Sequence, residues 1–336
     1  MRIPERLFHT LKYLIVITLL GFFFLVGWFY YLVNTTSRLP ATPYEFSIER
    51  GSSFRSIAHQ LTRNGLLPNA WSFILLSKIL GHESSVKAGD YVLTENVSPI
   101  QILEYLVKGD VKQNQIRFIE GWTFSQMREA LYQHPSIKHD TLHLNEQEIL
   151  QLIGATEEKA EGLFFPDTYF FVRNSSDVDI LKRAYQKMHK HLKAAWSSRK
   201  ESLPIKSEYE GLILASIIEK ETGKESDRSL IAGVLVNRLQ LGMRLQVDPT
   251  VIYGMGSNFD GNLRKRDLLT DQEYNTYTRS GLPPSPIAMP GLPSIRAAFN
   301  PAETDALYFV AKGNGESHFS TNLQDHNRAV QKYQKR

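Results

Sequence analysis

The sequence YLIVITLLGFFFLVGWFYYLV, residues 13–33, contains no charged residue and decides how the rest of the chain is organised. A helix rises about 1.5 Å per residue, so roughly 20 apolar residues are enough to cross the hydrocarbon core of a membrane. A cleaved signal peptide would have a shorter apolar region and a small-residue cleavage site, and residues 34–38, NTTSR, offer no such site. We therefore predict an uncleaved transmembrane helix.

The positive charges around this segment predict its orientation. Arg2, Arg6 and Lys12 precede it, whereas only Arg38 follows it within the next ten residues. Positive residues near a span are retained on the cytoplasmic side. We expect residues 1–12 to form a cytoplasmic head of a single-pass protein of the inner membrane, with the bulk of the chain on its outer, periplasmic face.

The composition excludes several classes of function. The chain has 336 residues and no cysteine, so it can form neither a disulfide nor a thiolate metal site. The net charge of +4 is too small to indicate a nucleic-acid partner. The sequence has no Gly-rich phosphate loop, and the pair His139 and His143 lacks the glutamate of a zinc-hydrolase helix. We expect neither a cofactor nor a metal.

The soluble part begins with a repeated pattern. After a proline-containing linker, residues 34–43, the chain is predicted to form a strand at 44–48, a glycine turn and a helix capped by Ser53. The same pattern recurs from residue 118, where Thr123 takes the place of Ser53. A strand, a glycine turn and a Ser/Thr-capped helix resemble the opening of a LysM module, a small α+β fold that binds N-acetylated glycans. We predict a LysM-like domain over residues 44–118.

Two carboxylates close an apolar helix in the C-terminal half. Ser207 is the expected N-cap of a helix through the apolar residues 211–218, which end in Glu219-Lys220-Glu221. A carboxylic acid against apolar walls has a raised pKa, as a general acid requires. A solvated last turn is the alternative. Spacing alone slightly favours Glu221 as the more buried acid.

Several long motifs then carry a resemblance to a known family. They are ASIIEKET at 215–222, VLVNRL at 234–239, GMRLQVDPTVIYG at 242–254, YNTY at 274–277 and GLPPSPI at 281–287. Together with His326-Asn327, they resemble the endolytic murein transglycosylases, the MltG or YceG-like family. Asp325 departs from the usual Glu-His-Asn ending of that family.

The resemblance implies a catalytic residue and a reaction. The first glutamate of the Glu-Lys-Glu motif, here Glu219, is expected to be the single general acid and base of a lyase. The enzyme would cleave the MurNAc-β-1,4-GlcNAc bond within nascent peptidoglycan strands, and the muramyl 6-hydroxyl would attack in place of water to give 1,6-anhydroMurNAc ends. The fold class is then α+β, with a transmembrane helix, the LysM-like domain and a mixed α/β catalytic domain over residues 119–336.

Other polar residues within or near these motifs are candidates for binding the glycan. Hydroxyl, amide and carboxylate groups suit sugar hydroxyls and acetamido groups, although turn formation and an Asx-turn explain some of them equally well. The candidates are Glu221, Gln246, Asp248, Thr250, Tyr253, Tyr274, Asn275, Tyr277, Asn322 and Asn327.

Two alternatives remain open at this level. One is a non-catalytic, membrane-anchored cell-wall protein that holds glycan through two LysM-like modules. The other is a lysozyme-like hydrolase in which Glu221 is the second carboxylate, although positions i and i+2 of a helix face different sides. As partners we expect peptidoglycan strands and the membrane, with peptidoglycan synthases as a further hypothesis.

Overall fold

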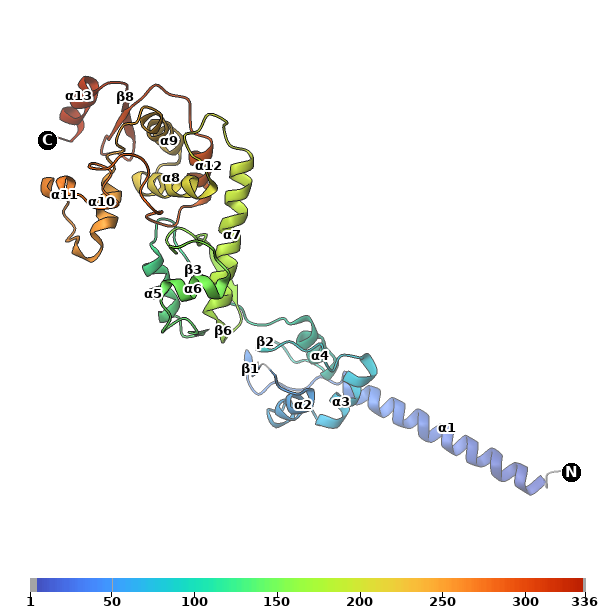
Figure 1. The fold of residues 1–336 in the computed structure, drawn as a ribbon. Coiled ribbons are helices and arrows are strands. Elements are labelled where there is room, and N and C mark those ends of the chain that lie inside the picture. The colour runs from blue at the N-terminus through green and yellow to red at the C-terminus, as the bar shows by residue number, and fades with distance from the viewer. Residues whose placement is uncertain (1–4, 50, 335–336) are drawn as a thin grey trace. The chain divides into compact units, whose positions relative to one another are not determined.

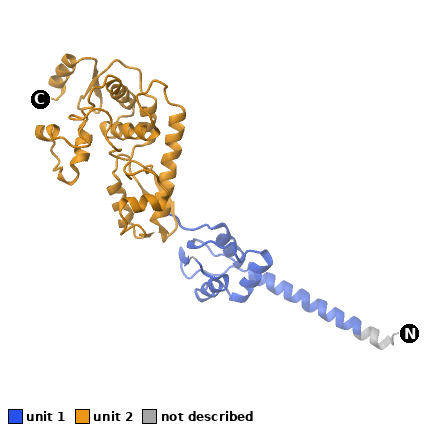
Figure 2. Ribbon diagram, in the orientation of Figure 1, with its two compact units in different colours: residues 1–114 blue, residues 115–336 orange. Residues whose placement is uncertain are grey.

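The computed structural model describes residues 5–49 and 51–334, and the chain divides into two compact units, residues 1–114 and 115–336 (Figures 1 and 2). Residues 1–4 of the predicted head lie outside the described residues. Helices and strands are mixed in both units, as predicted for an α+β protein.

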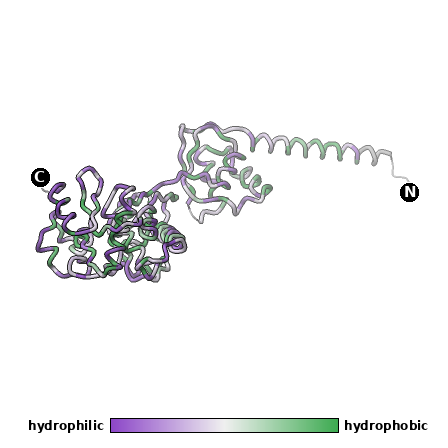
Figure 3. The backbone as a smooth tube through the Cα atoms, turned by 90° about the horizontal axis from the view of Figure 1, so that it is seen from above, coloured by the Kyte–Doolittle hydropathy of each residue, from purple (hydrophilic) through white to green (hydrophobic). Residues whose placement is uncertain are grey.

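The first unit starts with a long apolar helix, α1 (Glu5–Asn34). Its segment Leu11–Asn34, with a mean hydropathy of 2.2, is long and apolar enough to span a membrane (Figure 3). The C-terminal end of α1 belongs to the folded unit, because Val33 is only 4% exposed in its core. The rings of Trp28 and Trp71 also stack there, with centroids 5.7 Å apart.

The rest of the first unit is a small α+β fold. Two strands, β1 and β2, pair antiparallel with Tyr44 opposite Leu93, and apolar faces of the helices pack into one core. The elements in order are β1 (Tyr44–Ile48), α2 (Phe54–Arg63), α3 (Ala70–Leu80), β2 (Gly89–Leu93) and α4 (Pro99–Lys108).

The second unit opens with the predicted repeat. Gly51 and Gly121 both adopt positive φ, +85° and +77°, which a glycine tolerates best. Ser53 and Thr123 each cap the following helix by accepting a hydrogen bond from the backbone N–H three residues on. The repeated turn and cap are therefore confirmed. The second strand, in contrast, was expected to begin at residue 118, and it already ends at Arg117.

This N-terminal part of the second unit carries short strands and one long helix. β3 pairs with β5, and β4 pairs parallel with β6. The elements are β3 (Asn114–Arg117), α5 (Phe124–Gln133), β4 (Ile137–Lys138), α6 (Glu146–Ile153), β5 (Thr168–Phe171), β6 (Ser175–Ser176) and α7 (Asp177–Ser197).

The C-terminal part is built around α8 (Glu208–Glu221), whose residues 211–218 are all buried. Ser207 caps this helix as predicted by accepting from Glu210 N at 3.1 Å, and the Glu210 carboxylate accepts from Lys206 N. Near the C-terminus two strands pair antiparallel, with Tyr308 opposite Ser320. The remaining elements are α9 (Glu225–Gln240), α10 (Asp248–Met255), η1 (Gly256–Asn258), α11 (Lys265–Leu269), α12 (Leu292–Phe299), β7 (Tyr308–Ala311), β8 (Ser317–Ser320) and α13 (Leu323–Tyr333).

Candidate active site

The two glutamates at the end of α8, Glu219 and Glu221, have different surroundings. The Glu219 side chain is only 6% exposed, and its Oε1 lies 3.7 Å from Nη2 of Arg228 on α9. Its Oε2 accepts a hydrogen bond of 3.0 Å from Gly291 N, just before α12. These two contacts tie the Glu219 side chain to α9 and to the residue before α12.

The carboxylate of Glu120 lies near Glu219. A Cβ added to Gly291 would lie 2.0 Å from Oε1 of Glu120, and one added to Gly121 would lie 3.9 Å from Cγ of Glu219. Burial and the charge of Glu219 raise the pKa of Glu120. The turn at residues 120–121 thus covers Glu219, and Glu219 contacts protein on several sides.

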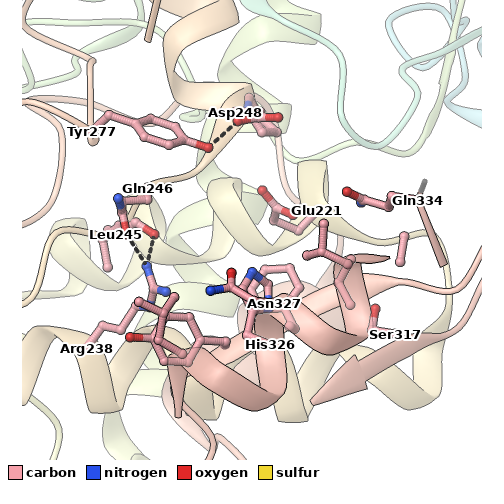
Figure 4. A pocket seen from close by; sticks show the side chains of 17 residues that line it. Glu221, Arg238, Leu245, Gln246, Asp248, Tyr277, Ser317, His326, Asn327 and Gln334 are labelled. Carbon is pink, nitrogen blue, oxygen red and sulfur yellow. Dashed lines mark hydrogen bonds between the residues drawn. The ribbon is translucent and has the colours of Figure 1, made fainter. Parts of the chain in front are cut away.

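Glu221 faces a polar cavity of about 500 Å³ (Figure 4). Asp248, at the first turn of α10, lines the same cavity, and the Tyr277 hydroxyl donates a hydrogen bond to its Oδ1. Burial, and then the negative charge of Asp248, raise the pKa of Glu221 to about 7. Glu221 therefore lines the cavity with a carboxyl group whose pKa is close to neutral pH.

The opposite end of the cavity is cationic. In Figure 4 Asp248 and Tyr277 lie at the top, Arg238, His326 and Asn327 at the bottom, and Glu221 between these two groups. Arg238 Nε donates to Leu307 O at 2.6 Å. Its Nη1 donates to the backbone oxygens of Arg244 and Leu245 and to Gln246 Oε1. The predicted binding residue Gln246 therefore holds Arg238 as well as lining the cavity.

Three predicted binding residues support the cavity wall from behind. Thr250 is fully buried, and its hydroxyl contacts Val247 O at 2.7 Å. Asn275 is also fully buried; its Nδ2 donates to three backbone oxygens of residues 267–270, and its Oδ1 accepts from Tyr277 N in an Asx-turn. Asn322 caps α13 by accepting from Asp325 N at 2.9 Å. These contacts fix Tyr277 and the start of α13 in place.

The two remaining predicted residues lie outside this cavity. The rings of Tyr253 and Tyr274 meet edge to face at 4.9 Å, and the Tyr274 hydroxyl lies 2.7 Å from Ser285 Oγ. Tyr253 donates to Oε2 of the buried Glu161 at 3.2 Å. Glu161 also accepts from Phe124 N, yet burial raises its pKa to about 7.

The structure adds three residues that the sequence analysis does not select, Glu161, Arg238 and His326. Arg238 lies within the VLVNRL motif, and His326 belongs to the His326-Asn327 motif, so the sequence contained a signal for both. Glu161 stands in a loop framed by glycine and proline. Within residues 5–49 and 51–334, no three His, Asp or Glu side chains are grouped so that they could hold a metal ion.

Comparison with known proteins gives matches over most of the chain. The model of the YceG-like family matches residues 46–332. The chain is 33% identical to an endolytic murein transglycosylase of Bacillus subtilis over 90% of its own length and 88% of that protein. It is 28% identical over 84% of its length to one from Streptococcus pneumoniae, of which it covers 57%.

A solved structure gives the same relationship. The crystal structure of a YceG-like protein from Listeria monocytogenes superimposes with a TM-score of 0.54 at 29% identity, covering 85% of this chain and 99% of that one. The family match covers the first unit from residue 46 onward and the second unit to residue 332. The chain belongs to the YceG-like family.

Proposed function

We propose that this protein is a membrane-anchored endolytic lytic transglycosylase, a lyase that cleaves MurNAc-β-1,4-GlcNAc bonds in peptidoglycan and leaves 1,6-anhydroMurNAc ends. Relatives named endolytic murein transglycosylases support this activity. The observation that carries it is a carboxylic acid with a pKa of about 7 facing a polar cavity large enough for sugar residues.

The general acid in this proposal is Glu221. A general acid must be protonated near the working pH and must reach the leaving oxygen. Glu221 meets both conditions, whereas Glu219, the acid expected from the resemblance, lies beside Arg228 and is covered by residues 120–121. Glu219 then holds the end of α8 in place through Gly291 and Arg228.

The reaction requires no second acid. Glu221 donates its proton to the glycosidic oxygen, the bond from that oxygen to C1 of MurNAc breaks, and positive charge develops on the sugar ring. The resulting Glu221 carboxylate accepts the proton of the muramyl 6-hydroxyl as O6 bonds to C1, so the acid is regenerated and no water is consumed. Asp248, held by Tyr277, adds negative charge that stabilises the cationic ring.

The first unit would hold the enzyme at the membrane and on its substrate. Its order of strand, two helices and strand supports a LysM-like glycan-binding role for residues 44–118. The burial of Val33 supports an uncleaved anchor, since cleavage after α1 would remove a core residue. An enzyme anchored in this way on the outer face of the inner membrane would meet nascent strands beside the peptidoglycan synthases and terminate them.

A lysozyme-like hydrolase is the second candidate, because Glu221 and Asp248 share one cavity. The products distinguish the two reactions. Full-length protein in detergent is incubated with purified glycan strands, and the new ends are identified by mass spectrometry. Anhydro-muramyl ends support the transglycosylase, and reducing ends identify a hydrolase. Strands that bind but stay intact contradict both and leave a glycan-binding protein.

A further inference from the structure

We propose that Arg238, His326 and Asn327 form a subsite for a carboxylate carried by the glycan strand, at the end of the cavity away from Asp248. This inference rests on the proposed function, because it specifies what the same cavity recognises in its substrate. It concerns binding, so it is tested separately from cleavage.

Arg238 provides the positive charge. Arg238 is only 7% exposed, yet no carboxylate lies within ion-pair distance of its guanidinium in the described part of the chain. Its hydrogen bonds run from Nε and Nη1 to backbone oxygens and one amide, so they leave its charge without an anionic partner. A buried charge without a counter-ion is costly, and an anionic ligand would supply the counter-ion.

The second terminal nitrogen of Arg238 is the free donor. None of the hydrogen bonds among residues 5–49 and 51–334 involves Nη2 of Arg238, and the side chain lines the cavity. The guanidinium lies over the Tyr308 ring, with Cζ 4.9 Å from the centroid, which fixes its plane. A guanidinium held by four acceptors and one ring is a rigid donor for a planar oxyanion.

Two further polar groups stand beside it on α13. The His326 ring stacks on Tyr308 with centroids 5.1 Å apart, and its Nδ1 is buried without a hydrogen-bond partner among the described residues. Asn327 follows it in the chain, lines the cavity, and is shown beside Arg238 in Figure 4. An unpaired buried nitrogen, an amide and a guanidinium at one end of a cavity are the donors that a carboxylate requires.

The cationic end lies apart from the acid end of the same cavity. In Figure 4 Asp248 lies above Glu221 and Arg238 lies below it. One ligand can therefore offer a neutral glycosidic oxygen to Glu221 and an anion to Arg238. Muramic acid carries a lactyl carboxylate when it has no stem peptide, and a stem peptide carries a terminal carboxylate, so the shared chemistry is a carboxylate.

Equilibrium binding to the full-length Glu221→Gln protein in detergent tests this, because the variant lacks the proposed acid. The probes are a GlcNAc–MurNAc tetrasaccharide with free lactyl carboxylates, the same sugar with these groups converted to methylamides, and a tetrasaccharide with pentapeptide stems. A charge-assisted hydrogen bond contributes about 1.5–3 kcal/mol, so the free carboxylate should bind at least about tenfold more tightly than the methylamide.

Asn327→Asp is then added to place a negative charge at this end of the cavity. It should remove the preference for the carboxylate, whereas Gln324→Asp, an exposed change on the same helix outside the cavity, should retain it. If Asn327→Asp weakens only the peptide-free sugar, the lactyl carboxylate is the ligand, and if it weakens only the pentapeptide sugar, the peptide carboxylate is.

Equal binding of the carboxylate and methylamide sugars, together with a pentapeptide sugar that is insensitive to Asn327→Asp, would overturn the subsite. This outcome is distinguishable from failure of the proposed function. If the wild type forms anhydro ends but shows no carboxylate preference, only the subsite proposal is contradicted. If it shows the preference but forms no anhydro ends, only the proposed reaction is contradicted.

Discussion

Glu219 and Glu221 lie two residues apart on α8, yet their carboxyl groups have opposite surroundings. Glu219 accepts from Gly291 N at 3.0 Å and has Arg228 at 3.7 Å. Glu221 shares an open polar cavity with Asp248, and its pKa is raised to about 7. The helix places one acid against Arg228 and Gly291 and the other at a polar cavity, and this difference is why we propose the second glutamate as the general acid.

The pH dependence of cleavage should report the interaction between Glu221 and Asp248. The rate should fall as the pH rises above about 7, where Glu221 loses its proton. Asp248→Asn removes a negative charge that raises the pKa of Glu221, so this fall should move to lower pH. The measurement is the rate of anhydro-end formation between pH 5 and 9.

The matched control for this change is Asp260→Asn, which removes an exposed aspartate paired with Arg264. Its profile should coincide with that of the wild type. A profile of Asp248→Asn that stays in place or moves to higher pH would be inconsistent with Glu221 as the acid.

Glu161 should make the stability of the protein depend on pH. Its folded-state pKa of about 7 exceeds the ordinary value of 4.5, so its stabilising contribution is present below about pH 4.5 and is lost as the pH rises through 7. That difference corresponds to roughly 3 kcal/mol of unfolding free energy. Glu161→Gln should flatten urea-unfolding stability over this range, and the exposed Glu158→Gln should not. Equal slopes in both variants would refute the role of Glu161.

The packing of α8 on α12 should depend on the absence of a side chain at Gly211. A Cβ added to Gly211 would lie 2.1 Å from Cζ of the buried Phe299. Gly211→Ala should therefore destabilise the protein by roughly 1–3 kcal/mol through overpacking. Gly223→Ala, at the other end of α8 with no atom within 4 Å of the added Cβ, is the control. Thermal unfolding measures both, and equal melting temperatures would contradict this packing.

The end of the membrane helix should contribute to the fold of the first unit. Val33 is 4% exposed in the core of that unit, whereas Val26, on the same helix, is 49% exposed. Val33→Ala should cost roughly 1–2 kcal/mol, and Val26→Ala should cost little. Hydrogen exchange of β1 and β2 in detergent measures the difference. Identical exchange in the two variants would contradict a contribution of α1 to the stability of the first unit.

Local signals in the sequence predicted much of the fold. The caps of α2, α5 and α8 and the glycine turns at Gly51 and Gly121 all act within a few residues, so a single sequence reveals them. The apolar run of α1 was visible for the same reason. The pairing of β3 with β5 was not, because it depends on contacts between distant segments.

The candidate site was only partly predictable for the same physical reason. Helical spacing slightly favoured Glu221 as the buried acid, but the groups that distinguish it from Glu219 are Gly291 and Asp248, far along the chain. Asn275 and Thr250 carry polar groups that could bind sugar, and only the structure shows that backbone atoms already occupy them. The motifs at 242–254 and 274–277 therefore each contain residues that line the cavity and residues that support its wall.

The most direct test of the central claim compares Glu221→Gln with Glu219→Gln in the full-length protein, by counting anhydro-muramyl ends released from glycan strands per unit time. General acid catalysis contributes about 10²- to 10⁴-fold, so Glu221→Gln should lower the rate at least about 100-fold while strands still bind. Glu219→Gln, which keeps a hydrogen-bond acceptor for Gly291 N, should retain most of the activity at a temperature where unfolding curves show it folded. Loss of cleavage in folded Glu219→Gln, with activity retained in Glu221→Gln, would contradict the account.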